Sequence, residues 1–237
     1  MKRVFKIVLV FLFTMCIFGC EDNSKKETKV NKTDAVKFKE EYEELNGSRN
    51  DSGKVIRVVS IPEDNPIVYS TAEEISKMID DKESFYVYFG FSKCPWCRSM
   101  IEQMFKAASA KNVDKIYYVD VLDIRDVLEL NDDGSVKTKT EGDKNYMKLI
   151  EQLGDVLSDY TLNDSEGNEV KTGEKRIYAP NIIAVKDGKA EQLEEGTADG
   201  LEDPYSELSD EMINNSYEKL ECIFKCLEDK VCTKNAC

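Results

Sequence analysis

Two cysteines separated by two residues, Cys94 and Cys97 in CPWC, are the side chains of this sequence best suited to chemistry. A cysteine thiolate attacks disulfides, and a second thiol within reach resolves the mixed disulfide that forms. An aromatic and β-branched run over residues 83–91 predicts a strand before the pair, and residues 94–110 predict a helix that begins at it. At a helix N-terminus, unpaired N–H groups and the helix dipole stabilise a thiolate. We therefore expect an exposed attacking thiol at Cys94 and a shielded resolving thiol at Cys97.

Other interpretations of the pair stay open at this point. The two cysteines also fit a structural disulfide or half of a metal site, although zinc needs four ligands. Trp96, the only tryptophan of the chain, lies between them. A lone tryptophan commonly lies in a core, but at this position we expect an exposed platform for a substrate chain. Lys93 precedes the pair, where it would either favour the thiolate electrostatically or stay solvated without effect.

The composition excludes several other kinds of site. The 237 residues include no histidine, which excludes a Ser-His-Asp triad, a Cys-His nucleophile pair and imidazole ligands for zinc. Asp and Glu number 47 against 33 Lys and Arg, so the net charge is −14. This acidic balance argues against a nucleic-acid partner. The length favours one domain.

Periodicity along the chain predicts alternating strands and helices around the dithiol. A hydroxyl cap at Ser70-Thr71 with Glu74 indicates the start of a helix. The order of elements is β-α-β-α-β-α-β-β-α, which predicts an α/β fold with a parallel or mixed sheet. Strands are expected over 54–61, 83–91, 115–122, 182–186 and 189–193, helices after the cap and over 94–110, 143–157 and 210–228, and loops over 130–142, 161–175 and 194–209.

Two motifs together resemble the thioredoxin superfamily. Residues 89–97 (FGFSKCPWC) are similar to the active-site edge of that family, and 178–189 (YAPNIIAVKDGK) resemble its cis-proline strand and the hairpin that follows. The resemblance covers residues 54–229. It implies a thioredoxin-like mixed sheet flanked by helices, with an insertion after the third strand. It also implies that Pro180 is cis and faces the dithiol, with Ala179 beside the sulfurs, so that both dock substrate together with Trp96.

The sequence departs from the family at three points. Tyr88 stands where thioredoxin has a buried aspartate, so the role of that acid is unassigned here. The CPWC pair is closer to the CPxC of glutaredoxins and of bacteriocin-accessory thioredoxin-like proteins. Pro180 follows Cys94 by 86 positions, about double the gap in thioredoxin, which is consistent with an insertion after the strand at 115–122.

The N-terminus predicts export and lipidation. A basic stretch over 1–6 and an apolar run over 7–18 end in Gly19-Cys20, a pattern that resembles the lipobox of bacterial lipoproteins. We expect residues 1–19 to be a signal peptide, Cys20 to be lipidated, and residues 20–53 to be a flexible tether in which 34–45 form at most a weak helix. The alternative is a secreted protein cleaved at another small residue. The first prediction places the domain on the extracytoplasmic face of a bacterial membrane.

Four more cysteines end the chain. Cys222 and Cys226 are four residues apart on the last expected helix, so they share a face. We favour two structural disulfides in the nested pairing Cys222–Cys237 and Cys226–Cys232, which lets the tail over 230–237 fold back along the helix. A zinc site with four thiolate ligands and a second redox relay that feeds Cys94–Cys97 are the alternatives.

The expected function is extracytoplasmic thiol–disulfide exchange through the CPWC dithiol. It needs no cofactor and no metal. Its partners would be protein thiols and disulfides, the membrane through the lipid anchor, and a membrane electron donor. The alternative is an accessory or metal-binding module for an exported peptide or protein, in which the pair binds a soft ion such as Cu(I) without redox turnover.

Overall fold

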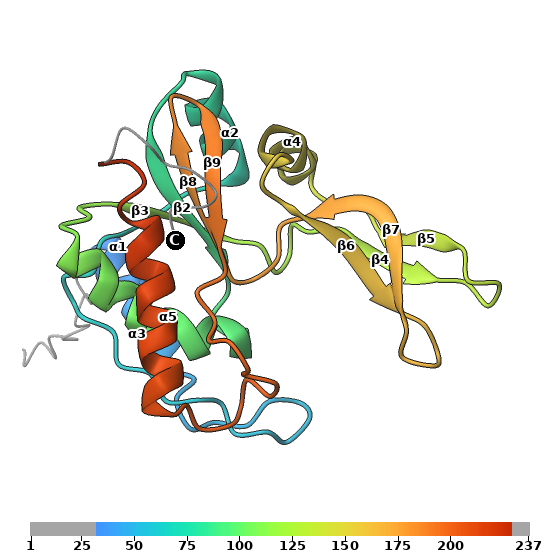
Figure 1. The fold of residues 1–237 in the computed structure, drawn as a ribbon, viewed down its shortest axis with the longest axis horizontal. Coiled ribbons are helices and arrows are strands. Elements are labelled where there is room, and N and C mark those ends of the chain that lie inside the picture. The colour runs from blue at the N-terminus through green and yellow to red at the C-terminus, as the bar shows by residue number, and fades with distance from the viewer. Residues whose placement is uncertain (1–31, 229–237) are drawn as a thin grey trace, which may run out of the picture. The chain divides into compact units, whose positions relative to one another are not determined.

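A five-stranded mixed sheet organises the part of the chain that the computed structural model describes, residues 32–228 (Figure 1). The helices in this part are α1 (Asp34–Glu43), α2 (Ala72–Asp80), α3 (Pro95–Ala110), α4 (Lys144–Leu153) and α5 (Asp210–Ile223). The strands are β1 (Ile67–Tyr69), β2 (Phe85–Gly90), β3 (Ile116–Asp120), β4 (Val127–Leu130), β5 (Val136–Thr140), β6 (Ser158–Asn163), β7 (Glu169–Arg176), β8 (Asn181–Lys186) and β9 (Lys189–Glu194). The predicted α/β class with a mixed sheet is confirmed.

Strand β2 lies at the centre of the sheet, whose order is β1-β3-β2-β8-β9. It pairs in parallel with β3 and antiparallel with β8. Parallel neighbours need a crossover, and α2 and α3 supply the crossovers on either side of β2 along the chain. The predicted hairpin between β8 and β9 is present, and Asp187 and Gly188 both have positive φ at its turn, as a two-residue hairpin turn requires.

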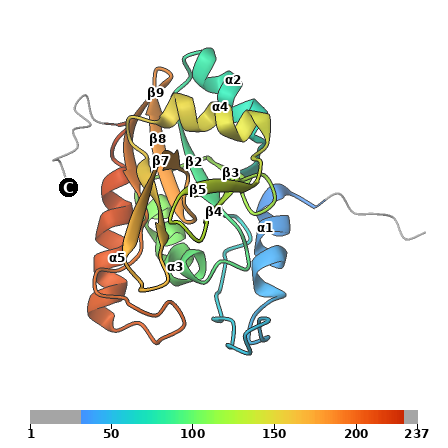
Figure 2. The same cartoon turned by 90° about the vertical axis from the view of Figure 1, so that its right-hand side faces the viewer.

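Helices cover both faces of the sheet. Helices α1, α3 and α5 share one buried cluster with the sheet, and α2 and α4 share the other (Figure 2). All six residues of β2 are buried, because this strand contacts helices on both faces. Each large apolar side chain removed from water in this way contributes about 1.5–3 kcal/mol. The dithiol at the start of α3 is therefore carried on the most deeply packed part of the domain.

The predicted cap of the first crossover helix is confirmed. The Thr71 hydroxyl accepts from the Glu74 N–H at 3.2 Å, and the Glu74 carboxylate accepts from the Thr71 N–H at 2.8 Å. This reciprocal capping box satisfies two N–H groups that the helix leaves unpaired, and such a cap is worth about 1 kcal/mol.

The prediction that residues 20–53 form a flexible tether is wrong from residue 34 onwards. Helix α1 packs on the sheet, and Phe38 and Tyr42 are 0% exposed. Their rings stack at 4.4 Å, and the Phe38 ring meets that of Tyr118 edge-on at 4.9 Å. The stretch has few apolar residues, but these two lie four apart and so form one aromatic face. Cys20, the signal over 1–19 and the tether up to residue 31 lie outside the described residues.

The strand expected over 54–61 is not formed. Val55 makes one isolated bridge with Arg49, and the rest of the segment belongs to no strand. Side chains hold it instead: the Asn46 amide donates to the Val59 carbonyl at 2.8 Å and its oxygen accepts from the Val59 N–H at 3.0 Å. The first strand of the sheet begins later, at Ile67.

Two of the expected loops contain hairpins instead. Strands β4 and β5 pair over part of 130–142, and β6 and β7 pair over part of 161–175. Every residue of β5 is exposed, so its Lys and Thr side chains give no apolar alternation for a sequence pattern to detect. With α4, the hairpins fill the long connection between β3 and β8. Residues 195–209 hold no helix or strand, as expected.

No helix within residues 32–228 combines the length and the apolar character that crossing a bilayer requires.

Candidate dithiol site

Cys94 lies where the sequence predicts it, at the N-terminus of the helix that follows β2. It is the N-cap of α3, and its Sγ accepts a hydrogen bond from the Cys97 N–H at 3.2 Å. Pro95 occupies the first turn, where its missing N–H costs nothing. A thiolate at this point meets the positive end of the helix dipole.

The two thiols are adjacent and chemically unequal. Cys94 and Cys97 are free thiols whose side chains lie 3.0 Å apart. The hydrogen bond from the Cys97 thiol lowers the pKa of Cys94, and the N–H groups of Cys97 and Trp96 lower it further against the opposing effect of burial. Burial raises the pKa of Cys97 well above its usual value, and the neighbouring Cys94 adds to this. The arrangement therefore favours ionisation of Cys94 over ionisation of Cys97.

A cation that the sequence did not reveal acts on Cys94. The positive charge of Arg125, in the segment after β3, also lowers the pKa of the Cys94 thiol. The Arg125 guanidinium lies over the Phe91 ring, 5.1 Å from its centroid. Lys93, which adjoins the cysteine in sequence, is exposed. No sequence pattern links positions 94 and 125, so only the fold identifies this cation.

The expectation that Cys94 is exposed is wrong. Its side chain is 3% exposed, and the thiol donates to the carbonyl oxygen of Ala179 at 3.2 Å. The Ala179–Pro180 peptide bond is cis, as the family resemblance implied, and Ala179 lies beside the sulfurs. The segment before β8 therefore covers the Cys94 thiol.

A groove of about 360 Å³ runs beside this edge. The three residues expected to dock substrate, Trp96, Ala179 and Pro180, all line it, so the structure brings them together. Trp96, expected to be an exposed platform, is half-buried, with one part packed on the core. The other lining residues are Tyr178, Glu195, Thr197 and Leu201.

The acidic loop after β9 was not expected to reach the site. Glu195 is its charged contribution to the groove. Burial, and then the neighbouring charge of Glu194, raise the pKa of the Glu195 carboxyl. The composition of 194–209 predicted a loop, but nothing in it indicated which of its carboxylates would line the groove.

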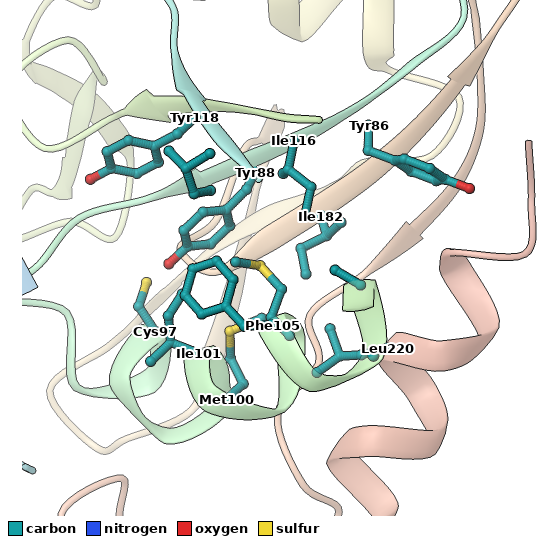
Figure 3. Packing of buried hydrophobic residues seen from close by; sticks show 14 of the residues in the cluster. Tyr86, Tyr88, Cys97, Met100, Ile101, Phe105, Ile116, Tyr118, Ile182 and Leu220 are labelled. Atoms are coloured by element: carbon teal, nitrogen blue, oxygen red, sulfur yellow. The ribbon is translucent and has the colours of Figure 1, made fainter. Parts of the chain in front are cut away.

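Tyr88 occupies the space beneath the buried thiol. Its hydroxyl hydrogen-bonds Cys97 and lies 2.9 Å from the hydroxyl of Tyr42. Figure 3 shows the Tyr88 hydroxyl directed at the Cys97 sulfur. Tyr42 comes from α1, the segment expected to be tether, so no sequence pattern predicted its position beside Tyr88.

Arg98 anchors the surroundings of the dithiol, and sequence reasoning missed it. Its side chain is 2% exposed. The guanidinium donates to the carbonyl oxygens of Tyr42 at 2.9 Å and Ser92 at 3.1 Å, and to Arg57 O at 2.6 Å. It thus ties α1, the loop before Cys94 and the 54–61 segment to α3. The one sequence signal for a role of Arg98 at the dithiol is its position directly after the second cysteine.

The second cysteine cluster is separate from the first. Cys222 and Cys226 are both disulfide-bonded, which confirms disulfides for these two and excludes them as free thiolate ligands of zinc. Cys232, Cys237 and the pairing itself lie outside the described residues. The Lys111–Glu221 ion pair, at 2.8 Å, places Cys222 beside the C-terminal end of α3.

Cys94 lies at the opposite end of that helix, which spans 16 residues, or about 24 Å. Direct thiol exchange requires one sulfur to attack another. Neither Cys222 nor Cys226 is placed to attack the Cys94–Cys97 pair, so the relay alternative has no support from their positions.

Within residues 32–228, no three His, Cys, Asp or Glu side chains gather as a metal site would require. The dithiol by itself would supply two thiolates, which falls short of the four ligands typical of structural zinc.

Compared with models of known protein families, with curated proteins and with solved structures, the chain matches none.

Proposed function

We propose that this chain is a protein thiol–disulfide oxidoreductase of thioredoxin-like fold. The observation that carries the proposal is the inequality of two adjacent thiols: the pKa of Cys94 is lowered and that of Cys97 is raised. A structural disulfide needs no such difference. Exchange chemistry does, because one thiol attacks the substrate disulfide and the other attacks only later, when it resolves the mixed disulfide.

The arrangement of the sheet supports the thioredoxin-like part of the proposal. The dithiol begins the helix after the central strand, and the cis Ala179–Pro180 peptide directly before the antiparallel strand β8 contacts it through the Ala179 carbonyl. These are the two features that the motifs at 89–97 and 178–189 implied. The hairpins and α4 between β3 and β8 correspond to the insertion expected after the third strand.

The reaction is an exchange of sulfur–sulfur bonds. The Cys94 thiolate attacks a substrate disulfide, one bond forms between Cys94 and the nearer substrate sulfur, and the other substrate sulfur leaves as a thiolate. Cys97 then attacks Cys94 Sγ, and the second substrate sulfur leaves. The substrate gains two electrons and two protons while the pair becomes a disulfide. A dithiol on a partner protein reverses these steps on the Cys94–Cys97 disulfide to restore the thiols.

The groove suits an extended polypeptide segment next to a cysteine. Ala179 offers main-chain groups at the sulfurs, and Trp96 offers a flat apolar surface beside them. When Cys94 ionises, its thiol no longer donates to Ala179 O, so this carbonyl becomes available to a substrate N–H. A protein disulfide, rather than a small thiol, is therefore the proposed substrate.

An extracytoplasmic location, with the lipid anchor at Cys20, is part of the proposal. Disulfides at Cys222 and Cys226 support it, because structural disulfides persist in oxidising compartments. The signal-like pattern over 1–18 supports it independently. The membrane electron donor named above fits this location.

The first experiment is a measurement of the reduction potential of the Cys94–Cys97 pair in the full chain, by alkylation mass shift across defined thiol buffers. A value of about −270 mV indicates a reductant, and about −120 mV indicates a disulfide donor. Cys97→Ser should trap a mixed disulfide with a protein substrate, and Cys94→Ser should not. A pair that never cycles between these potentials, in a chain that co-purifies with metal, overturns the proposal in favour of the metal-binding module.

A further inference from the structure

Two buried tyrosines connect helix α1 to the resolving thiol. Tyr88 and Tyr42 are both 0% exposed. The Tyr88 hydroxyl hydrogen-bonds the Cys97 thiol, and the two hydroxyl oxygens lie 2.9 Å apart. The exchange steps described above use neither tyrosine, so their position under the dithiol needs its own explanation.

The number of protons fixes the direction of these hydrogen bonds once Cys97 is ionised. A thiolate has no proton to give, so the Tyr88 hydroxyl must donate its single proton to Cys97 Sγ. The Tyr88 oxygen is then free to accept from Tyr42. The result is a donor chain from Tyr42 through Tyr88 to Cys97, in which each hydrogen bond polarises the next in a low-dielectric interior.

The backbone around the dithiol leaves room for this series of hydrogen bonds. The Tyr88 ring lies over Gly90, and a Cβ at position 90 would come within 2.3 Å of the Tyr88 hydroxyl oxygen. Any residue other than glycine at 90 would displace the hydroxyl. At the other end, Arg98 Nη1 donates to the Tyr42 carbonyl at 2.9 Å, which fixes α1 against the dithiol helix.

We propose that Tyr88 is a catalytic residue for the resolving step, in which its hydroxyl stabilises the Cys97 thiolate, and that Tyr42 is a positioning residue that acts through Tyr88. This inference rests on the proposed exchange reaction. The tyrosines act as donors and not as bases, because burial raises the pKa of both hydroxyls well above the usual value. A hydrogen-bond donor thus stands where thioredoxin has a buried acid.

In the resolving step, neither tyrosine gives up or takes a proton. Cys97 gives its proton to the substrate thiolate released in the first step and attacks Cys94 Sγ. The Cys94–Cys97 bond forms, the bond from Cys94 to substrate breaks, and the electron pair leaves on the substrate sulfur, which takes a proton from solvent. Tyr88 keeps its proton and shares it with the transient Cys97 thiolate.

The titratable and charged groups that face Cys97 come from three elements. Cys94 and Arg98 belong to its own helix, Tyr88 to β2 and Tyr42 to α1. Replacing Cys94 by alanine removes the like charge and leaves Cys97 without a thiol partner. Burial and the remaining three groups then determine the titration, and two of these groups are the proposed donors.

The test is a titration of Cys97 by thiolate ultraviolet absorbance in the full chain with Cys94→Ala. Adding Tyr88→Phe keeps the ring and removes the hydroxyl, and should raise the pH midpoint by about one unit. Tyr42→Phe should raise it by less. Tyr86→Phe is the matched control, because its buried hydroxyl, on the same strand, donates to the Phe224 carbonyl instead. An equal midpoint in Tyr88→Phe and Tyr86→Phe overturns the inference.

A kinetic measurement completes the test. With both cysteines present, a preformed Cys94–peptide mixed disulfide should be resolved about tenfold more slowly in Tyr88→Phe, while the alkylation rate of Cys94 is retained. An unchanged resolution rate contradicts the proposed role. If Tyr88→Phe does not fold by circular dichroism, the smaller upward shift of the Tyr42→Phe midpoint decides the question. The titration needs no turnover, so failure of the oxidoreductase proposal in the potential measurement is distinguishable from failure here.

Discussion

The Cys94 thiol donates a hydrogen bond to the carbonyl oxygen of Ala179 at 3.2 Å. The proposed nucleophile and the edge proposed to dock substrate are therefore in direct contact in this structure. Ionisation of Cys94 ends that contact and leaves both groups as acceptors. In this geometry, ionisation of the Cys94 thiol also frees the Ala179 carbonyl oxygen at the proposed docking edge.

Arg125→Gln should raise the pKa of Cys94, because it removes a positive charge that favours the thiolate. The measurement is the pH dependence of iodoacetamide alkylation at Cys94, whose midpoint should move up by a few tenths of a unit. Lys93→Gln, next to Cys94 in sequence but exposed, is the matched control and should leave the midpoint in place. Equal shifts in both variants would mean that the net charge of the protein, and not the position of Arg125, moves the midpoint.

The stability of the reduced protein should depend on pH through Cys94. Its folded pKa is lowered, so its contribution is fully present above the unfolded value of roughly 8.5 and is lost as pH falls through the folded pKa. The difference in unfolding free energy between the reduced chain and Cys94→Ala should therefore grow as pH rises through that window. Denaturant unfolding at several pH values measures it, and a difference that stays flat contradicts a lowered pKa.

Trp96→Ala should weaken substrate docking without changing the thiols. Loss of the indole removes apolar surface from the groove that also holds Ala179 and Pro180. We expect kcat/KM for a disulfide-containing peptide to fall about tenfold, and the alkylation rate of Cys94 to stay the same. Leu122→Ala, an exposed apolar residue outside the groove lining, is the control, and an equal loss there would remove Trp96 from the docking surface.

Phe38→Ala should destabilise the domain by about 3–5 kcal/mol, the usual cost of deleting a fully buried phenylalanine. Phe38 is 0% exposed and packs against Tyr118 and Phe105. Val58→Ala, at a site that is 67% exposed, should change stability by less than about 0.5 kcal/mol. Chemical denaturation compares the two, and a loss at Phe38 no larger than at Val58 would restore the tether interpretation.

The sequence predicted best where a feature is local. Cys94 as an N-cap depends on its own helix, and the Thr71–Glu74 capping box spans four residues. The hairpin turn at 187–188 is equally short-range. Each was predicted correctly, because the interactions that form it lie within one turn of chain.

Prediction failed where a residue depends on distant contacts. Tyr42 is 46 positions from Tyr88, and a polar helix with two aromatic residues looks like tether until the sheet that buries them is known. Arg98 makes its hydrogen bonds to carbonyls of three separate segments. Arg125 reaches Cys94 only because β3 lies beside β2. Strand β5 was missed for a different reason, since a fully exposed strand needs no apolar pattern.

Helix α1 precedes the strands that it packs against in the sequence, so the order of synthesis affects when the site is completed. A chain emerges from its N-terminal end, so Phe38 and Tyr42 are made before every strand they contact. Phe38 packs against Tyr118, and its ring has no complete pocket until that residue has left the ribosome. The Phe38 ring of α1 is thus fully packed only after β3 has been made. The dithiol helix can form before that moment, but the aromatic packing around the hydroxyl pair beneath it is complete only after Tyr118 of β3 has been made.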